Sequence, residues 1–497
     1  MKIDLNGRSI SCCREIFRQK KLASEQVESI VPDVLDDVGQ ISHAEAQICL
    51  NSKEIEKDGI RIGARAEICV FYITEDRERI RNIKFSKDLE IFFECPSVPA
   101  DGIVQVAFTC RQVQARALNP RKITAQIIVE TDLSCWSGDS FSLPCEVNAA
   151  QEDGLHLRMQ NTECLLTIQA CEKSFSLQEQ FPLPSDGEVS EIVGTYADLC
   201  YTSHQLIGSR ALIRGGAEVR IAYASGEDGM PLFIKQCIPF SVLLDMPHDT
   251  CELGRVSFVP TTVYAGLEQS INDAQSIGLE IRAVAQVCFE QRERLDYLSD
   301  AYSTRCPANT DTVSAEILVR QNTERLTVHA ADSFHPSEKG DLAAEAYAEI
   351  RSVSLNEGKA AASVSVDLLF RADDGSFFTQ QRSFFCEAVL PEKGGEITGA
   401  RLLSANAAAE GDSVAVETSV EFSYLLGERK EIRYLSSLDL AEEESFDPAQ
   451  YPSITVVKRG GRELWELAKL YRSSTELIEA MNEAYPLREG LLLIPKA

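Results

Sequence analysis

The chain has 497 residues, of which 44% are hydrophobic and 25% are charged. Because domains typically hold about 100–200 residues, the sequence predicts several domains with ordinary packed cores rather than wholesale disorder. The formal net charge is −28, from 77 acidic and 49 basic residues. This balance argues against a nucleic-acid partner, since binding to a phosphate backbone depends on clustered Lys and Arg.

The sequence favours a cytosolic protein without a bound metal. No apolar core of signal-peptide length follows Met1–Gly7, and no apolar run predicts a membrane span. The 16 cysteines contain no CxxC pair, so buried reduced thiols are expected, because disulfide-stapled secreted modules are usually short. The six histidines lack zinc-ligand spacing. We therefore predict no metal, no cofactor and no catalytic residue.

One β pattern recurs three times. Stretches in which apolar residues alternate with polar ones lie at 62–72, 213–223 and 362–370. An acidic residue marks the polar face of each stretch: Glu67, Glu218 and Asp367. A proline follows the next apolar strand in each copy: Pro96, Pro247 and Pro391. A period of two is typical of half-buried strands, so these common spacings indicate repeats.

Each copy also closes with a longer alternating strand, and these strands lie at 123–129, 279–287 and 414–424. One apolar and one polar face suits antiparallel sheets packed as sandwiches. The sequence therefore predicts a mainly β fold. We expect three tandem antiparallel β-sandwich-like repeats, the third one shortened, at 1–150, 151–310 and 311–440.

An acidic linker is expected at 441–452, followed by a small α+β domain at 453–497. Ile454–Val457 predicts a strand, and the pair Gly460–Gly461 predicts a tight turn before a helix. Ser473–Glu476 is typical of a capping box that starts a second helix. We expect Asn482 to end that helix and Leu491–Pro495 to form a second strand.

This strand–helix–helix–strand order resembles a LysM domain. The matching residues are Gly461, Leu464, Trp465, Ala468, Tyr471, Leu477, Asn482 and Leu493–Pro495. The resemblance implies a groove for a ligand or partner, with these candidate residues: Gly461, Arg462, Glu463, Leu464, Asn482, Tyr485 and Pro486. LysM domains bind N-acetylglucosamine sugars there. Arg462 departs from the family, which usually has an Asp that could cap the first helix.

Two side-chain roles in this domain stay open. Trp465 either seals the two helices against the strand pair or stays exposed to stack on a partner. Tyr485 and Pro486 either pack the loop or line the groove.

The whole arrangement resembles spore coat morphogenetic proteins of the SipL type, whose repeat is called the SPOCS domain. The residues that carry this resemblance are 30–38, Gly63, Tyr72, 119–123, Gly215 and Tyr223. The resemblance implies a non-enzymatic scaffold in the mother cell, at the forespore surface. It also implies that the LysM domain takes part in binding the coat basement ATPase, SpoIVA, and that other coat proteins are tethered.

Two other functions remain as alternatives. A cell-wall protein could bind peptidoglycan through the LysM domain. An enzyme lacks support, because no nucleophile elbow, phosphate loop, HExxH or Rossmann fingerprint is present. Arg214–Gly216 predicts a β-bulge. Asp373–Gly375 and Glu227–Gly229 predict hairpin turns rather than calcium sites.

Overall fold

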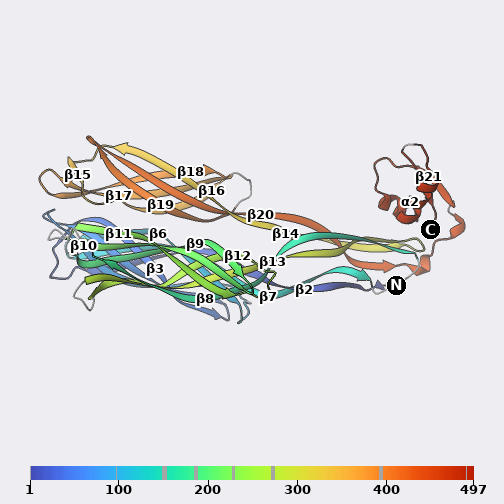
Figure 1. Cartoon of the computed structure of the whole chain (residues 1–497), viewed down its shortest axis with the longest axis horizontal. Coiled ribbons are helices and arrows are strands. Elements are labelled where there is room, and N and C mark those ends of the chain that lie inside the picture. Colours follow the sequence, from blue (N-terminus) through green and yellow to red (C-terminus); the bar gives the residue numbers. More distant parts are fainter. Residues whose placement is uncertain are drawn as a thin grey trace.

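The computed structural model describes residues 2–96, 98–147, 154–183, 189–225, 230–269, 275–356, 358–390, 396–450, 452–488 and 490–497. Strands make up most of this part of the chain, and its α-helices lie near the C-terminus. The prediction of a mainly β protein is therefore confirmed. Figure 1 shows an elongated molecule with packed sheets at one end and the C-terminal helices at the other.

The first unit is a sandwich of two antiparallel sheets. Its strands are β2 (Leu5–Ile30), β3 (Val38–Glu56), β4 (Gly59–Thr74), β5 (Ile80–Glu94), β6 (Ile103–Asn119) and β7 (Lys122–Val147). The sheet orders are β2-β7-β6 and β3-β4-β5. Alternate residues of β4 and β7, such as Ala66 and Ile127, are fully buried between the sheets. The predicted alternation thus marks the inner faces.

The second unit has the same strand order. Its strands are β8 (Leu155–Pro182), β9 (Val189–Ile207), β10 (Arg210–Ser225), β11 (Met230–Asp245), β12 (Glu252–Gln269) and β13 (Gln275–Ser303). They pair as β12-β13-β8 and β11-β10-β9.

The third unit follows this order with one added short strand. Its strands are β14 (Ala308–Phe334), β15 (Gly340–Leu342), β16 (Tyr347–Asn356), β17 (Lys359–Ala372), β18 (Phe377–Val389), β19 (Glu396–Glu410) and β20 (Ser413–Leu440). The N-terminal β1 (Lys2–Ile3) pairs with β20, so the start of the chain is joined to the third unit.

The three acidic residues that mark the pattern occupy matching positions in β4, β10 and β17. The residue opposite each one on the preceding strand lies 20 positions earlier, and the pairs are Glu67–Gln47, Glu218–Asp198 and Asp367–Tyr347. The spacing in the sequence therefore reflects one register that occurs in all three units.

The predicted bulge and one predicted turn are confirmed. The pairing of β9 with β10 shifts register between Arg214 and Gly215. Asp373–Gly375 forms the turn between β17 and β18. The other predicted turn, Glu227–Gly229, and Pro391 lie outside the described residues.

The closing strands are much longer than the sequence predicts. They span 26 residues in β7, 29 in β13 and 28 in β20. Each pairs along its length with the first strand of its unit, giving the ribbons β2–β7, β8–β13 and β14–β20. Figure 1 shows these ribbons continuing beyond the sandwiches toward the C-terminal helices.

The ribbons pack against one another where they leave the sandwiches. One buried cluster joins Leu143 of β7, Cys164 of β8, Leu295 of β13 and Ile432 of β20. A second cluster, nearer the termini, joins Ile3, Leu298 and Leu438 among others. The three units are therefore parts of one packed body rather than separate beads.

A buried polar junction also joins the units. The guanidinium of Arg220 in the second unit pairs with the carboxylate of Glu45 in the first unit. It also lies 4.7 Å from the ring centre of Tyr196 and 5.1 Å from that of Tyr347 in the third unit. Removing one member of such a buried pair leaves the other charge uncompensated, which typically costs about 3–5 kcal/mol. Arg220 thus links all three units.

His43 lies at the same junction, stacked between Phe71 and Tyr347 at centroid distances of 4.4 and 4.8 Å. Burial lowers the pKa of His43 to about 3, and the positive charge of Arg220 acts in the same direction. This histidine is therefore a neutral core residue that packs the first unit against the third.

The C-terminal module, residues 453–497, contains β21 (Ile454–Lys458), α1 (Leu464–Tyr471), α2 (Thr475–Ala484) and β22 (Leu491–Pro495). This is the predicted strand–helix–helix–strand order. Two details of the prediction are wrong. The N-cap of α2 is Ser474, whose Oγ accepts from the Leu477 amide at 3.1 Å, and α2 continues past Asn482 to Ala484.

The acidic stretch before this module is anchored to the body. It contains two short 3-10 helices, η1 (Glu442–Glu444) and η2 (Pro448–Gln450). The amide of Phe446 donates to the carbonyl of Arg305 at 2.7 Å, and the guanidinium of Arg472 lies over the Phe446 ring. The predicted solvated linker is thus largely exposed but fixed at Phe446.

We predict that His43→Phe makes the unfolding free energy less dependent on pH in the acidic range. The pKa of His43 is about 3 when folded, against an ordinary value of 6.5. The stability that its neutral form provides is therefore complete above about pH 6.5 and is lost as the pH falls toward 3. We expect this histidine to lower the unfolding free energy by about 1.4 kcal/mol per pH unit in that window.

Denaturant unfolding of the protein and of His43→Phe, between about pH 7 and pH 4, measures this pH dependence. The phenyl ring keeps both stacking partners but takes up no proton. His248→Phe, at an exposed position, is the matched control. Equal pH dependence in His43→Phe and in the unaltered protein would contradict the prediction.

Candidate partner-binding site

The turn between β21 and α1 forms one side of the predicted groove. Gly460 and Gly461 have φ values of +58° and +81°, a left-handed conformation that glycine adopts without steric cost. The Arg462 amide donates to the Arg459 carbonyl at 3.0 Å, and the Arg459 amide donates to the Gly490 carbonyl at 2.9 Å. These bonds hold the first turn beside the turn that precedes β22.

Arg462, Glu463 and Leu464 have different surroundings. Arg462 is exposed. Glu463 is the extended N-cap of α1 and makes no side-chain cap bond; its Oε2 accepts instead from Nη2 of Arg158 in β8, at 2.6 Å. Leu464 packs against the buried residues of the module core. Arg462 is therefore available to a partner, whereas Glu463 is already paired with the body.

The side chain of Asn482 is held by hydrogen bonds within the module. Its Nδ2 donates to the carbonyls of Ile478, at 2.7 Å, and Leu493, at 2.6 Å. Its Oδ1 accepts from the Leu493 amide at 2.8 Å. The side chain thus joins α2 to β22, and a ligand could bind it only by breaking these bonds.

Tyr485 and Pro486 follow α2 on the surface. Tyr485 is 66% exposed, and Pro486 is exposed as well. The interpretation that they pack the loop is wrong for Tyr485, because most of its ring surface faces solvent. Of the seven predicted residues, Gly461, Arg462, Tyr485 and Pro486 are therefore open to a partner.

One face of α1 is docked on the β8–β13 ribbon. The indole Nε1 of Trp465 donates to Oδ2 of Asp300 at 2.7 Å. The ammonium of Lys469, one helical turn later, lies 2.6 Å from Oδ1 of the same carboxylate. Spacing of four residues puts both donors on one helix face, so Asp300 holds that face of α1.

Tyr302 of β13 completes the core of the module. It is 3% exposed and belongs to the same buried cluster as Leu467, Ile478 and Ile494. Its hydroxyl donates to the Ser473 carbonyl at 2.7 Å. Its ring meets that of Trp465 edge-on at 4.9 Å. Trp465 therefore seals the module against the body, which neither sequence interpretation included.

Sequence reasoning missed this interface because its members are far apart in the chain. Asp300 and Trp465 are separated by 165 residues, and Asp300–Tyr302 follows no recognisable motif. A charged residue and an aromatic near the end of a strand are common surface features, so the local pattern carries no signal for docking.

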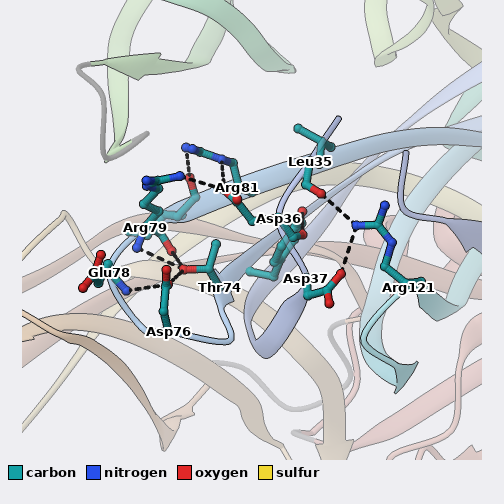
Figure 2. A network of polar contacts seen from close by, with 11 residues as sticks. Leu35, Asp36, Asp37, Thr74, Asp76, Glu78, Arg79, Arg81 and Arg121 are labelled. Atoms are coloured by element: carbon teal, nitrogen blue, oxygen red, sulfur yellow. Dashed lines mark hydrogen bonds and ion pairs between the residues drawn. The ribbon is translucent and has the colours of Figure 1, made fainter. Parts of the chain in front are cut away.

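A second ordered polar network holds the loop at 31–37 in the first unit. Nη1 of Arg121 donates to the carbonyl of Leu35 at 2.7 Å and to Oδ1 of Asp37 at 3.0 Å. Figure 2 shows Arg121 reaching this loop, with Asp36 facing Arg81 of β5. The two segments quoted for the SipL resemblance, 30–38 and 119–123, therefore touch in space.

Two kinds of feature are absent from the described residues, metal-ligand clusters and membrane-spanning helices. No group of three or more His, Cys, Asp or Glu side chains among them could hold a metal ion. Within the same part of the chain, no helix has the length and apolar character needed to cross a membrane.

We predict that Asp300→Ala loosens the module. The variant removes the acceptor of Trp465 and Lys469, and hydrogen bonds to a charged group contribute about 1.5–3 kcal/mol. The contribution of the Lys469–Asp300 ion pair to stability is small, because the Lys469 side chain is 42% exposed and solvent screens such pairs. We expect faster amide hydrogen exchange in α1 of the full chain.

Asp296→Ala is the matched control for this experiment. Asp296 lies on the same strand and pairs with the exposed Arg294, at 3.3 Å. Exchange rates in α1 that are the same for both variants would show that Asp300 does not hold the helix.

Comparison with known families identifies part of the first unit. Residues 37–118 match the family model SipL, SPOCS domain. This segment starts at the 31–37 loop and covers β3, β4, β5 and nearly all of β6. Comparisons with curated proteins and with solved structures gave no match. The match suggests a sporulation-related, spore-associated role, and it supports a SipL-type protein with a SPOCS domain in its first unit.

Proposed function

We propose that the protein is a non-enzymatic scaffold in spore coat assembly, which tethers coat proteins to the forespore surface. The observation that carries the proposal is the SPOCS match in the first unit. The fold supports it, because three units share one packed body and present a small module at one end (Figure 1). A packed body can hold a binding surface on the module at a fixed position relative to the three units.

We infer that all three units are SPOCS-like repeats. The family match lies in the first unit, and the second and third units repeat its order of strand pairing. The common register of Glu67, Glu218 and Asp367 supports the same inference.

We infer that the C-terminal module is a LysM domain that binds the coat basement ATPase, SpoIVA. The strand–helix–helix–strand order supports the LysM assignment. The open side of its groove, at Gly461, Arg462, Tyr485 and Pro486, supports a role in binding. Leu464 and Asn482 stabilise the groove from inside.

The proposal places the protein in the mother cell, around the forespore. We expect a fluorescent fusion to be produced only during sporulation and to form a ring at the forespore surface. Fluorescence microscopy of sporulating and vegetative cells measures both. Export to the wall of vegetative cells would contradict the proposal.

The second candidate function is binding of peptidoglycan or its precursors. The observation that favours it is the exposed aromatic ring of Tyr485, a residue of the predicted groove. Arg462 opposes it, since a LysM domain usually has Asp there.

Co-sedimentation with purified peptidoglycan separates the two functions. If the groove binds protein, Arg462→Asp should weaken SpoIVA capture, because it reverses the charge of an exposed groove residue. The same variant should bind peptidoglycan better than the unaltered protein, because it restores the Asp that LysM domains usually have. Strong peptidoglycan binding by the unaltered protein that Arg462→Asp leaves unchanged would favour the wall-binding function.

A further inference from the structure

Two turns of the C-terminal module gather basic side chains on its surface. We call this set the basic turn, and it consists of Lys458, Arg459, Arg462 and Arg488. The Arg459–Gly490 backbone bond, at 2.9 Å, joins the two turns. A third bond, from the Leu491 amide to the Arg488 carbonyl at 3.1 Å, closes the second turn. The backbone segments that carry the four cations are therefore held together.

The side chains of the basic turn face solvent. All of its members are exposed, and none forms an ion pair with an acidic residue in the part of the chain that the structure describes. By contrast, Lys469 on the docked face is paired with Asp300 at 2.6 Å. Neighbouring cations repel one another. An anionic partner would be attracted to them and would also reduce that repulsion.

The charge of the module contrasts with that of the body. Residues 453–497 carry seven basic and six acidic residues, which leaves 42 basic and 71 acidic residues in the rest of the chain. A long polyanion such as a nucleic acid would be repelled by that acidic body. A short acidic segment that reaches only the module would not.

Apolar side chains border the basic turn. Leu487 is 41% exposed and Leu491 is 37% exposed, and they lie on either side of the turn that contains Arg488. Tyr485 adds a ring that is 66% exposed. Protein interfaces commonly combine aromatic and apolar anchors with a charged rim, so this surface fits a protein segment better than a bare anion.

We propose that the basic turn, with Leu487, Leu491 and Tyr485, binds a protein segment that is rich in Asp or Glu and carries apolar side chains. This inference rests on the proposed function and names the partner chemistry of the same module. Docking uses Trp465 and Lys469 of α1, whereas the basic turn lies outside that helix, so it remains open while the module is docked.

Binding of a short fluorescent peptide of alternating Glu and Leu to the full chain tests the proposal. We expect saturable binding that weakens as salt rises from about 0.05 to 0.5 M. The double variant Arg459→Gln/Arg488→Gln should bind about tenfold more weakly or worse. A peptide of alternating Gln and Leu, which keeps the apolar side chains without the charge, should bind at least tenfold more weakly.

The control variant is Arg282→Gln/Arg294→Gln, which makes the same charge change at exposed positions on β13 and should bind normally. Equal affinity in both double variants would overturn the proposal. So would phosphatidylglycerol vesicles that bind through the basic turn when the acidic peptide does not, because the surface would then recognise lipid.

Purified SpoIVA separates this inference from the proposed function. Capture of SpoIVA that is lost in Arg459→Gln/Arg488→Gln supports the inference. Capture that is unaffected by this variant overturns the inference and leaves the scaffold function standing. Failure of the unaltered chain to bind SpoIVA contradicts the proposed function itself.

Discussion

The long strand pairs have more apolar surface than their own sandwiches can cover, and this constraint shapes the molecule. β7, β13 and β20 continue beyond the sandwich cores, and their overhanging ends still carry apolar residues such as Leu143, Leu295 and Ile432. A ribbon of two strands is marginally stable by itself in water. The three overhangs bury these residues against one another, and the units therefore form one body.

The same constraint places the C-terminal module. The β8–β13 ribbon ends near Tyr302, whose ring packs among the buried residues of the module, and the module has a core of few residues. A domain of this size buries a small fraction of its surface and has little stability in reserve. Tyr302 therefore stabilises the module while the module covers the ribbon end. As a consequence, the docked module holds the basic turn in a fixed direction relative to the ribbon.

Local periodicity predicted the strands well, because the alternation of side chains between two faces is a property of each strand alone. The lengths of the ribbons could not be predicted in this way. Past Val287, for example, β13 runs through the charged segment Arg292–Asp296, which interrupts the apolar pattern although strand pairing continues. The contact of Arg220 with Glu45 depends on how whole units pack, and spacing in the sequence does not encode it.

Part of the C-terminal module could be predicted, and its groove stays a prediction. The resemblance to LysM located the turn at Gly461. It gave no signal that the carboxamide of Asn482 bonds to the backbone of Leu493. It could not find the docked face, because Trp465 meets a carboxylate from another unit. The capping-box pattern pointed to Ser473, but only the Ser474 hydroxyl reaches the Leu477 amide.

The three units and the module form one body, and carbodiimide coupling of the native chain tests this arrangement most directly. This reagent joins an amine to a carboxylate that touches it, and the described residues contain four such pairs across the boundaries in the body. They are Lys53–Glu172, Lys84–Glu191, Lys235–Glu345 and Lys469–Asp300. Mass spectrometry of the coupled monomer should find all four as major products. Lysines coupled to scattered carboxylates, with these pairs absent, would contradict the account.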